Sequence, residues 1–243
     1  MGIPQGSVLS STLFAIAING VTSCLPTGLS HSLYVDDFAI YYTSSRLSHI
    51  QRILNIAITR ITSWASSVGF QFSPEKTKAI VFYRNRRHLH NESINLYMGD
   101  VPISFHSSVR FLGIIFDTHL NWKSHITDLK TRCNRRLNVL KKVASTRWGA
   151  DRSTLLTLYR ATVLAVLDYG SPIYGTASIA ALRSLDPIHH LGVRLSSGAF
   201  KSSRIQSVLV ESGVMPLSLH RTQVMMKSAV RLISSDSPAQ KLL

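Results

Sequence analysis

Apolar residues recur at helical spacing in two segments of the N-terminal part of the chain. An opening turn with Pro4 and Gly6 precedes apolar positions that repeat every three or four residues over residues 8–22, which predicts a buried helix. A longer apolar stripe over residues 47–68 follows Ser44 and Ser45, either of which can cap a helix, and it ends before a glycine that favours helix termination. Ordinary core packing explains this second stripe.

Shorter apolar stretches around these helices predict strands. Residues 30–42 carry β-forming side chains on both sides of Asp36 and Asp37, so we expect a β-hairpin with the two acids at its bend. Residues 70–78 read as a loop that contains Pro74. Further strands are expected over residues 79–83, 94–98, 101–105 and 109–116, of which the second and third are joined by a Gly-Asp turn.

From Trp122 onward the spacing of the apolar residues is helical. Helices are expected over residues 122–144, 151–168, 179–195, 204–211 and 217–234. The chain is therefore expected to mix strands and helices up to about residue 117 and to be entirely helical after it. This organisation predicts an α+β fold.

Positive charge is concentrated in the last two thirds of the chain. The sequence has 27 Lys and Arg against 12 Asp and Glu, a formal charge of +15, yet only three of the basic residues precede Glu75. A basic loop lies at residues 84–90, and the densest stretch contains Lys130, Arg132, Arg135, Arg136, Lys141 and Lys142. A solvated helix face is one explanation, but such faces normally mix both signs, so the pattern favours a polyanionic partner such as nucleic acid.

Several classes of protein are excluded by what the sequence lacks. The longest strictly apolar run, residues 13–18, is far shorter than a bilayer-spanning helix, and we expect no membrane association and no secretory signal. Cys24 and Cys133 are too far apart in sequence for a metal-binding pair, which is typical of a reducing compartment. The common hydrolase and nucleotide-loop motifs are absent, and the pair His189 and His190 is interpreted as structural.

The adjacent acids Asp36 and Asp37 are the strongest candidates for chemistry. Two carboxylates between hydrophobic strand segments repel each other, and a bound divalent cation would reverse that repulsion because Mg²⁺ prefers oxygen ligands. Neighbouring residues of an extended chain face opposite ways, so Asp36 is assigned as ligand and Asp37 as support. A solvated turn with two acids explains the pair equally well when it is considered alone.

Four motifs follow one another along the chain: the turn with Gln5 and Gly6, Tyr34-Val35-Asp36-Asp37, Pro74-Glu75-Lys76-Thr77-Lys78 and Phe111-Leu112-Gly113. In this order they resemble motifs B, C, D and E of reverse transcriptases, specifically the enzymes of non-LTR, LINE-like retrotransposons. Residues 167–175 also look like a segment found downstream in these elements. The order and spacing of the four motifs are far more specific than any one of them.

This resemblance implies RNA-directed DNA synthesis, in which two Mg²⁺ (or Mn²⁺) ions assist transfer from a dNTP to a primer 3′-hydroxyl on an RNA template. It implies metal binding by Asp36 and Asp37 and a catalytic role for Lys76, which would meet charge developing on pyrophosphate. Other implied roles are template and nucleotide binding by Gln5, Gly6 and Tyr34, primer support by Phe111, Leu112 and Gly113, and phosphate contacts by the six cations of residues 130–142.

The resemblance also implies a domain organisation. Residues 1–118 would form a partial polymerase palm, an antiparallel sheet with packed helices, and residues 119–243 a helical, basic thumb with its downstream region. No acid precedes Asp36, so the family's other metal-binding aspartate and its fingers are expected in a segment missing from the N-terminal side of the same polyprotein. We therefore expect a polymerase fragment that is inactive by itself.

Two other functions are compatible with the residues. One is a nucleic-acid-binding remnant of a retroelement without enzymatic activity, which predicts salt-sensitive binding that Asp36→Ala leaves unchanged or strengthens. The other is a structural or interaction module in which the two acids are incidental, which predicts weak nucleic-acid affinity. For all three functions we expect an intracellular protein, nuclear and cytoplasmic.

Overall fold

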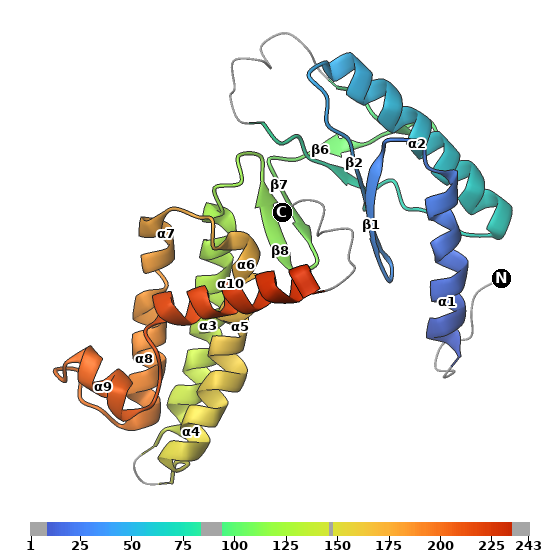
Figure 1. Ribbon diagram of the computed structural model, residues 1–243. Coiled ribbons are helices and arrows are strands. Elements are labelled where there is room, and N and C mark those ends of the chain that lie inside the picture. Colours follow the sequence, from blue (N-terminus) through green and yellow to red (C-terminus); the bar gives the residue numbers. More distant parts are fainter. Residues whose placement is uncertain (1–8, 84–93, 146–147, 235–243) are drawn as a thin grey trace. The chain divides into compact units, whose positions relative to one another are not determined.

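The computed structural model describes residues 9–83, 94–145 and 148–234, and it divides the chain into two compact units (Figure 1). The first unit comprises Met1–Gly113 and the second Ile114–Leu243. The palm and thumb assignments for these parts of the chain stay predictions. Within the described residues, no helix has the length and apolar character needed to cross a bilayer.

Two helices dominate the first unit. The helix expected over residues 8–22 is α1 (Ser10–Asn19), followed by the tighter 3-10 turn η1 (Gly20–Cys24). Ile18 is the only buried residue of α1, so the prediction of a buried helix is wrong. The second expected helix is α2 (Leu47–Val68), and Gly69 ends it with a φ of 77°. The predicted serine cap is wrong, because Arg46 occupies the N-cap position without a side-chain cap. Ser44 Oγ instead accepts a hydrogen bond from the N–H of Arg46, which precedes the first residue of the helix.

The strands of the first unit form small two-stranded sheets. The expected hairpin is confirmed as β1 (Ser30–Tyr34) paired antiparallel with β2 (Asp37–Tyr41). β4 (Tyr97–Met98) pairs antiparallel with β5 (Val101–Pro102), whereas β3 (Lys78–Ala79) pairs parallel with β6 (Ser104–Phe105). Among the described residues the mixed α+β class therefore holds, but the strands do not join into one antiparallel sheet.

The strand predictions are wrong in detail. The strand expected over residues 94–98 covers only Tyr97–Met98, and the one expected over residues 101–105 is interrupted at Ile103, between β5 and β6. Of the strand expected over residues 79–83, only Ala79 is in a strand, which ends after a two-residue ladder with β6. The strand expected over residues 109–116 is interrupted, so that β7 (Ser108–Phe111) and β8 (Ile114–Asp117) flank a turn. Leu112 and Gly113 occupy that turn with φ angles of 45° and 77°, a backbone conformation that ends an extended segment.

The core of the first unit is built on α2. One face of this helix packs Ala57 and Ile61 against Val21 and Leu29, and an adjoining face packs Ile58 against residues that flank β4 and β5. Two side-chain amides of α2 also form hydrogen bonds with the backbone of the segment that leads into β4. Gln51 Oε1 accepts from the Asn95 N–H at 3.0 Å, and Asn55 bonds both the Asn95 carbonyl and the Tyr97 N–H at 3.1 Å. The segment that enters β4 is thereby fixed to α2.

The second unit is helical after β8, as expected. Its helices are α3 (Lys123–Val143), α4 (Arg152–Tyr159), the π-helical turn η3 (Arg160–Leu164), α5 (Ala165–Asp168), α6 (Ser171–Tyr174), α7 (Ile179–Arg183), α8 (Asp186–Ser197), α9 (Ile205–Glu211) and α10 (Leu217–Ser234). The single helix expected over residues 179–195 is two helices, because α8 restarts with Pro187 in its first turn, where its missing N–H does no harm.

Helices α4 and α8 pack closely in an antiparallel arrangement. Ser196 Oγ donates to the Leu155 carbonyl at 3.2 Å, and one turn away Gly192 lies against the ring of Tyr159. The Tyr159 hydroxyl lies 2.5 Å from His189 Nδ1, and His189 Nε2 lies 3.0 Å from the Met215 carbonyl. Burial lowers the pKa of His189 to about 4. The interpretation of this histidine as structural agrees with these contacts.

Cys133 belongs to the same core. Its side chain is fully buried on α3, and burial raises the pKa of its thiol to about 11. Cys24 is partly buried, and its thiol donates to the Val21 carbonyl at 2.9 Å. Burial also raises the pKa of Cys24. Both cysteines are free thiols.

Candidate active site and nucleic-acid interface

The candidate catalytic carboxylates lie at the tip of the β1–β2 hairpin. Tyr34 and Asp37 are paired across the strands, so Val35 and Asp36 form a two-residue turn. Val35 has a φ of 55°, which is rare for a β-branched residue and strained by about 1–3 kcal/mol. The turn exposes Asp36 to solvent, and Asp37 begins β2 with its side chain also exposed.

This exposure changes the electrostatic argument for a metal. The sequence predicted partly desolvated acids that would need a cation, but water screens both carboxylates at the hairpin tip. The pair is therefore tolerable without an ion. Within the described part of the chain, no group of three or more His, Cys, Asp or Glu side chains is arranged to hold a metal ion.

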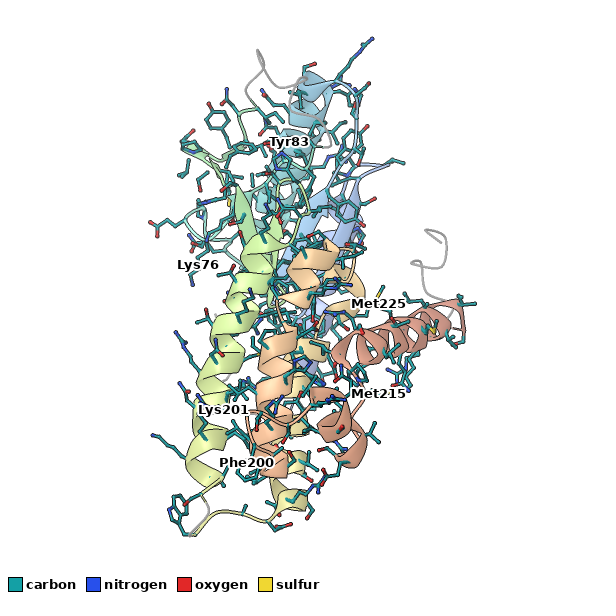
Figure 2. The ribbon with its side chains drawn as sticks, turned by 90° about the vertical axis from the view of Figure 1, so that its left-hand side faces the viewer. Lys76, Tyr83, Phe200, Lys201, Met215 and Met225 are labelled. Carbon is teal, nitrogen blue, oxygen red and sulfur yellow. The ribbon has the colours of Figure 1, made fainter. Side chains whose placement is uncertain are left out.

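Lys76 lies in a turn that is connected to the hairpin by aromatic packing. The Thr77 hydroxyl and N–H both bond the Ser73 carbonyl, which closes the turn and leaves Lys76 exposed (Figure 2). Phe72 packs on Phe38 with ring centroids 6.5 Å apart. Because Phe38 directly follows Asp37, the same core holds both the hairpin and the chain that leads to Lys76.

Gln5 and Gly6 lie outside the described residues, so their position relative to Asp36 stays a prediction. The helix that follows them, α1, is joined to the hairpin's surroundings through Phe14, whose ring meets that of Phe70 edge-on at 5.9 Å. Phe70 in turn packs on Trp64 of α2. The helix after motif B and the turn of motif D are thus both anchored near the C-terminal end of α2.

Phe111, Leu112 and Gly113 form the end of β7 and the turn after it. All three residues are half-buried, and the Arg110 guanidinium donates to the Gly113 carbonyl at 3.5 Å. Leu112 is a second residue without the freedom of glycine that adopts a positive φ. The primer-support role of these residues stays a prediction.

The cations of α3 fall into two groups. Arg132 pairs with Asp128 at 2.8 Å, and Arg136 donates to the Thr162 carbonyl at 2.7 Å, so both are engaged within the unit. Arg135, Lys141 and Lys142 are exposed and Lys130 is half-exposed, and Arg135 and Lys142 lie opposite the buried positions 129, 133, 137 and 140. Lys141 donates to Asn138 Oδ1 on the same helix at 3.4 Å. All four side chains are open to phosphates.

Comparison with known protein families identifies the class of protein that the first part of the chain resembles. A model described as "Reverse transcriptase (RNA-dependent DNA polymerase)" matches residues 1–116. Residues 1–116 belong to the reverse transcriptase family. The matched range contains all four motifs on which the resemblance rests, from the turn of Gln5 and Gly6 to Gly113.

Relatives of this reverse transcriptase segment come from insect retrotransposons. A Pol polyprotein from retrotransposable element R1 2 of Nasonia vitripennis is 26% identical over 69% of this chain and 42% of its own length. The probable RNA-directed DNA polymerase of transposon X-element and that of mobile element jockey, both from Drosophila melanogaster, are 25% and 23% identical and are covered over 22% and 27% of their lengths. The chain thus spans less than half of each of these relatives. No solved structure gives a significant match.

Several features of the reverse transcriptase segment were not visible in the sequence. Nothing in its pattern marks Val35 or Leu112 as residues with positive φ, since valine and leucine disfavour that conformation. The hydrogen bonds from the side-chain amides of Gln51 and Asn55 to the backbone of residues 95–97 join positions about 40 residues apart. The only sequence signal for them is the presence of two amides, one helical turn apart, on α2.

Proposed function

We propose that the chain is part of the RNA-directed DNA polymerase of a non-LTR retrotransposon and that the hairpin tip carries catalytic carboxylates. The observation that supports this most directly is the exposure of Asp36 in a strained two-residue turn within the reverse transcriptase segment. Backbone strain persists where surrounding structure enforces it, and such strain is common at active sites. The hairpin core, with Leu33, Phe38 and Ile40, supplies that support.

The donor set fits a magnesium ion of the kind that polymerases use. Mg²⁺ keeps several waters and is held by one or two carboxylates together with substrate phosphates, and Asp36 and Asp37 offer two carboxylates open to solvent. Mn²⁺ accepts the same ligands. When bound, the ion supplies charge stabilisation for the attacking and leaving oxygens of phosphoryl transfer.

The remaining residues bind and orient the substrates in this proposal. Tyr34, exposed beside the turn, packs near the primer terminus, and Gln5 and Gly6 line the template and nucleotide site. The ammonium of Lys76 faces the pyrophosphate, and the turn of Phe111, Leu112 and Gly113 supports the primer backbone.

Residues of α3 hold the nucleic-acid backbone in the same proposal. Lys130, Arg135, Lys141 and Lys142 contact phosphates of the primer–template, which gives affinity without reading sequence. Replacing Arg135 with Gln is expected to weaken binding at all sequences and to reduce the slope of log K against log salt by about 1. RNA template, DNA primer and dNTP are the partners implied.

The catalytic role is tested in a chimaera. The chain replaces the matching segment of the jockey polymerase, with which 99% of this chain aligns. RNA-templated primer extension is then measured. Asp36→Asn is expected to abolish extension, because the amide loses the charge that holds a cation. Asp100→Asn, at an exposed acid in another hairpin turn, is the matched control and is expected to leave extension unchanged. Equal activity of the two variants would refute the proposal.

A polypeptide of these 243 residues alone is expected to give no template-dependent synthesis with Mg²⁺ or Mn²⁺. Within these residues no acid precedes Asp36, so one metal-binding carboxylate of the family is lacking. The missing fingers and palm residues are expected from another part of the same polyprotein. Extension by the 243-residue polypeptide in a primer-extension assay would contradict this.

Nucleic-acid binding without catalysis is the second candidate function. It is favoured by the exposed cations of α3 and by the lack, among described residues, of a three-residue metal cluster. Asp36→Ala separates the two candidates. In the chimaera, the catalytic proposal predicts loss of synthesis, whereas binding alone predicts unchanged or tighter primer–template affinity and no synthesis by either form.

A further inference from the structure

Two large aromatic side chains lie exposed at one end of the helical unit. Trp148 is 71% exposed in the connection between α3 and α4, and Phe200 is 80% exposed in the loop between α8 and α9. Both exceed the exposure expected of residues that normally bury most of their surface. Isolated exposed apolar residues need no explanation, but two aromatic rings at one place do.

The packing of α4 on α8 brings the two connections to the same end. Leu155 is bonded to Ser196 and Tyr159 lies against Gly192, so the helices run antiparallel with the start of α4 level with the end of α8. Arg152 also joins the start of α4 to the end of α9, because its guanidinium donates to both the carboxylate and the carbonyl of Glu211 at 2.8 Å. Figure 1 shows the end of α3, the start of α4 and the end of α8 together.

Hydrogen bonds hold the backbone next to each of the two rings. The Arg194 guanidinium donates to the carbonyls of Phe200 and Ser203 at 2.6 and 2.8 Å, which fixes the loop that carries Phe200 and Lys201 (Figure 2). On the other connection, the N–H groups of Gly149 and Ala150, the two residues after Trp148, donate to the carbonyls of Ser145 and Val143. Rings held in this way lose little conformational entropy when they bind a ligand.

The charge at this end is positive. Lys141, Lys142, Lys201 and Arg204 are exposed there. The two nearby acids are occupied within the unit: Asp151 caps α4 through Ser153 and Thr154, and Glu211 pairs with Arg152. The surface therefore combines exposed cations with exposed aromatic rings.

We propose that Trp148 and Phe200, with the surrounding lysines, form a stacking platform for single-stranded nucleic acid. Bases in a single strand offer unpaired π-faces to aromatic side chains while cations hold the phosphates. A duplex already stacks its bases and presents only backbone to such a surface. The inference rests on the proposed nucleic-acid function and adds an aromatic site that shares Lys141 and Lys142 with the cations of α3.

The test uses the 243-residue protein and a fluorescein-labelled uridine oligonucleotide of about 12 nucleotides, a length typical of single-strand sites. Binding is followed by fluorescence anisotropy. Trp148→Ala and Phe200→Ala are each expected to weaken binding about tenfold, the effect of losing one stacked base. Phe200→Tyr, which keeps a ring, is expected to bind as wild type does. Ile179→Ala, at an equally exposed residue of α7, is the control and is expected to have no effect.

An RNA–DNA duplex of equal length separates this inference from the proposed function. The aromatic substitutions are expected to leave duplex binding unchanged, whereas Arg135→Glu weakens it. Failure of the wild-type protein to bind the duplex would contradict the proposed function. Unchanged oligonucleotide binding in the two alanine variants would overturn only the platform.

Phe200→Leu distinguishes stacking from apolar docking. Leucine keeps much of the apolar area without a π-face, so the stacking platform predicts that it binds as weakly as the alanine variant. Full binding by Phe200→Leu would overturn the proposal. A change in oligomeric state in Trp148→Ala or Phe200→Ala by sedimentation, with unchanged oligonucleotide affinity, would overturn it in favour of a protein interface. Circular dichroism of each variant confirms that the helices remain folded.

Discussion

Gly192→Ala tests whether close packing of α4 on α8 maintains the helical unit. A Cβ at position 192 would lie 2.5 Å from Cδ2 of Tyr159 and still nearer to Cε2, closer than real Cβ contacts allow. The ring cannot easily move aside, because Tyr159 is fully buried and its hydroxyl is bonded to His189. The substitution must therefore separate the helices or break that bond.

The expected magnitude follows from three opposing effects. Overpacking a core costs about 1–3 kcal/mol. Loss of a buried hydrogen bond adds about 1–3 kcal/mol if Tyr159 and His189 separate. In the opposite direction, replacing a helical glycine by alanine stabilises the helix by about 1 kcal/mol through its higher helix propensity. We expect a net destabilisation of about 1–5 kcal/mol, although alanine is the better helix former.

The assay is urea unfolding followed by tryptophan fluorescence in a Trp64→Phe background, so that the emission comes from Trp122 and Trp148 of the helical unit. A double-mutant cycle with Tyr159→Leu identifies the cause, since removing the ring should make Gly192→Ala much less harmful. A coupling of more than about 1 kcal/mol is expected for residues in such contact. An additive cycle, or a Gly192→Ala protein as stable as wild type, would refute the steric argument.

Three further predictions concern other contacts. Acidification from pH 6.5 to about 4 is expected to destabilise the helical unit, because His189 binds a proton in the unfolded chain but stays neutral when it is buried in the folded one. His189→Asn should remove up to about 3 kcal/mol of this pH dependence in urea titrations. Asn55→Ala, which removes both bonds to residues 95–97, is expected to lower the stability of the first unit by about 1–3 kcal/mol in thermal denaturation, and an unchanged melting temperature would contradict it. Val35→Asn is expected to stabilise that unit by about 0.5–1 kcal/mol, because asparagine tolerates positive φ, and a loss of stability in the same assay would show that Val35 is not strained.

Periodicity predicted most of the helices because each buries one continuous stripe. The helix at residues 217–234 was predicted with the bounds that the structure gives, and the stop of α2 at Gly69 followed from the ability of glycine to adopt positive φ. The strands were less predictable. Residues 109–116 read as one strand, and the positive φ angles of Leu112 and Gly113 divide them into two.

Motif order predicted the family of residues 1–116, whereas the electrostatic argument about the two acids was wrong. The hairpin with Asp36 in its bend is present, but the argument from buried, repelling acids assumed a burial that the structure does not have. Burial of a short turn depends on which other chain segments cover it, and local sequence carries no such information. The aromatic contact between Phe38 and Phe72 was equally hidden, because it joins residues more than thirty positions apart.

The burial of Cys133 makes the protein convenient for site-specific chemistry. Its raised thiol pKa keeps the reactive thiolate scarce at neutral pH, and the same holds more weakly for Cys24. A cysteine introduced at an exposed position such as 200 would therefore react first with a maleimide dye. Single-molecule or distance measurements could begin from the natural sequence, without first removing its own two thiols.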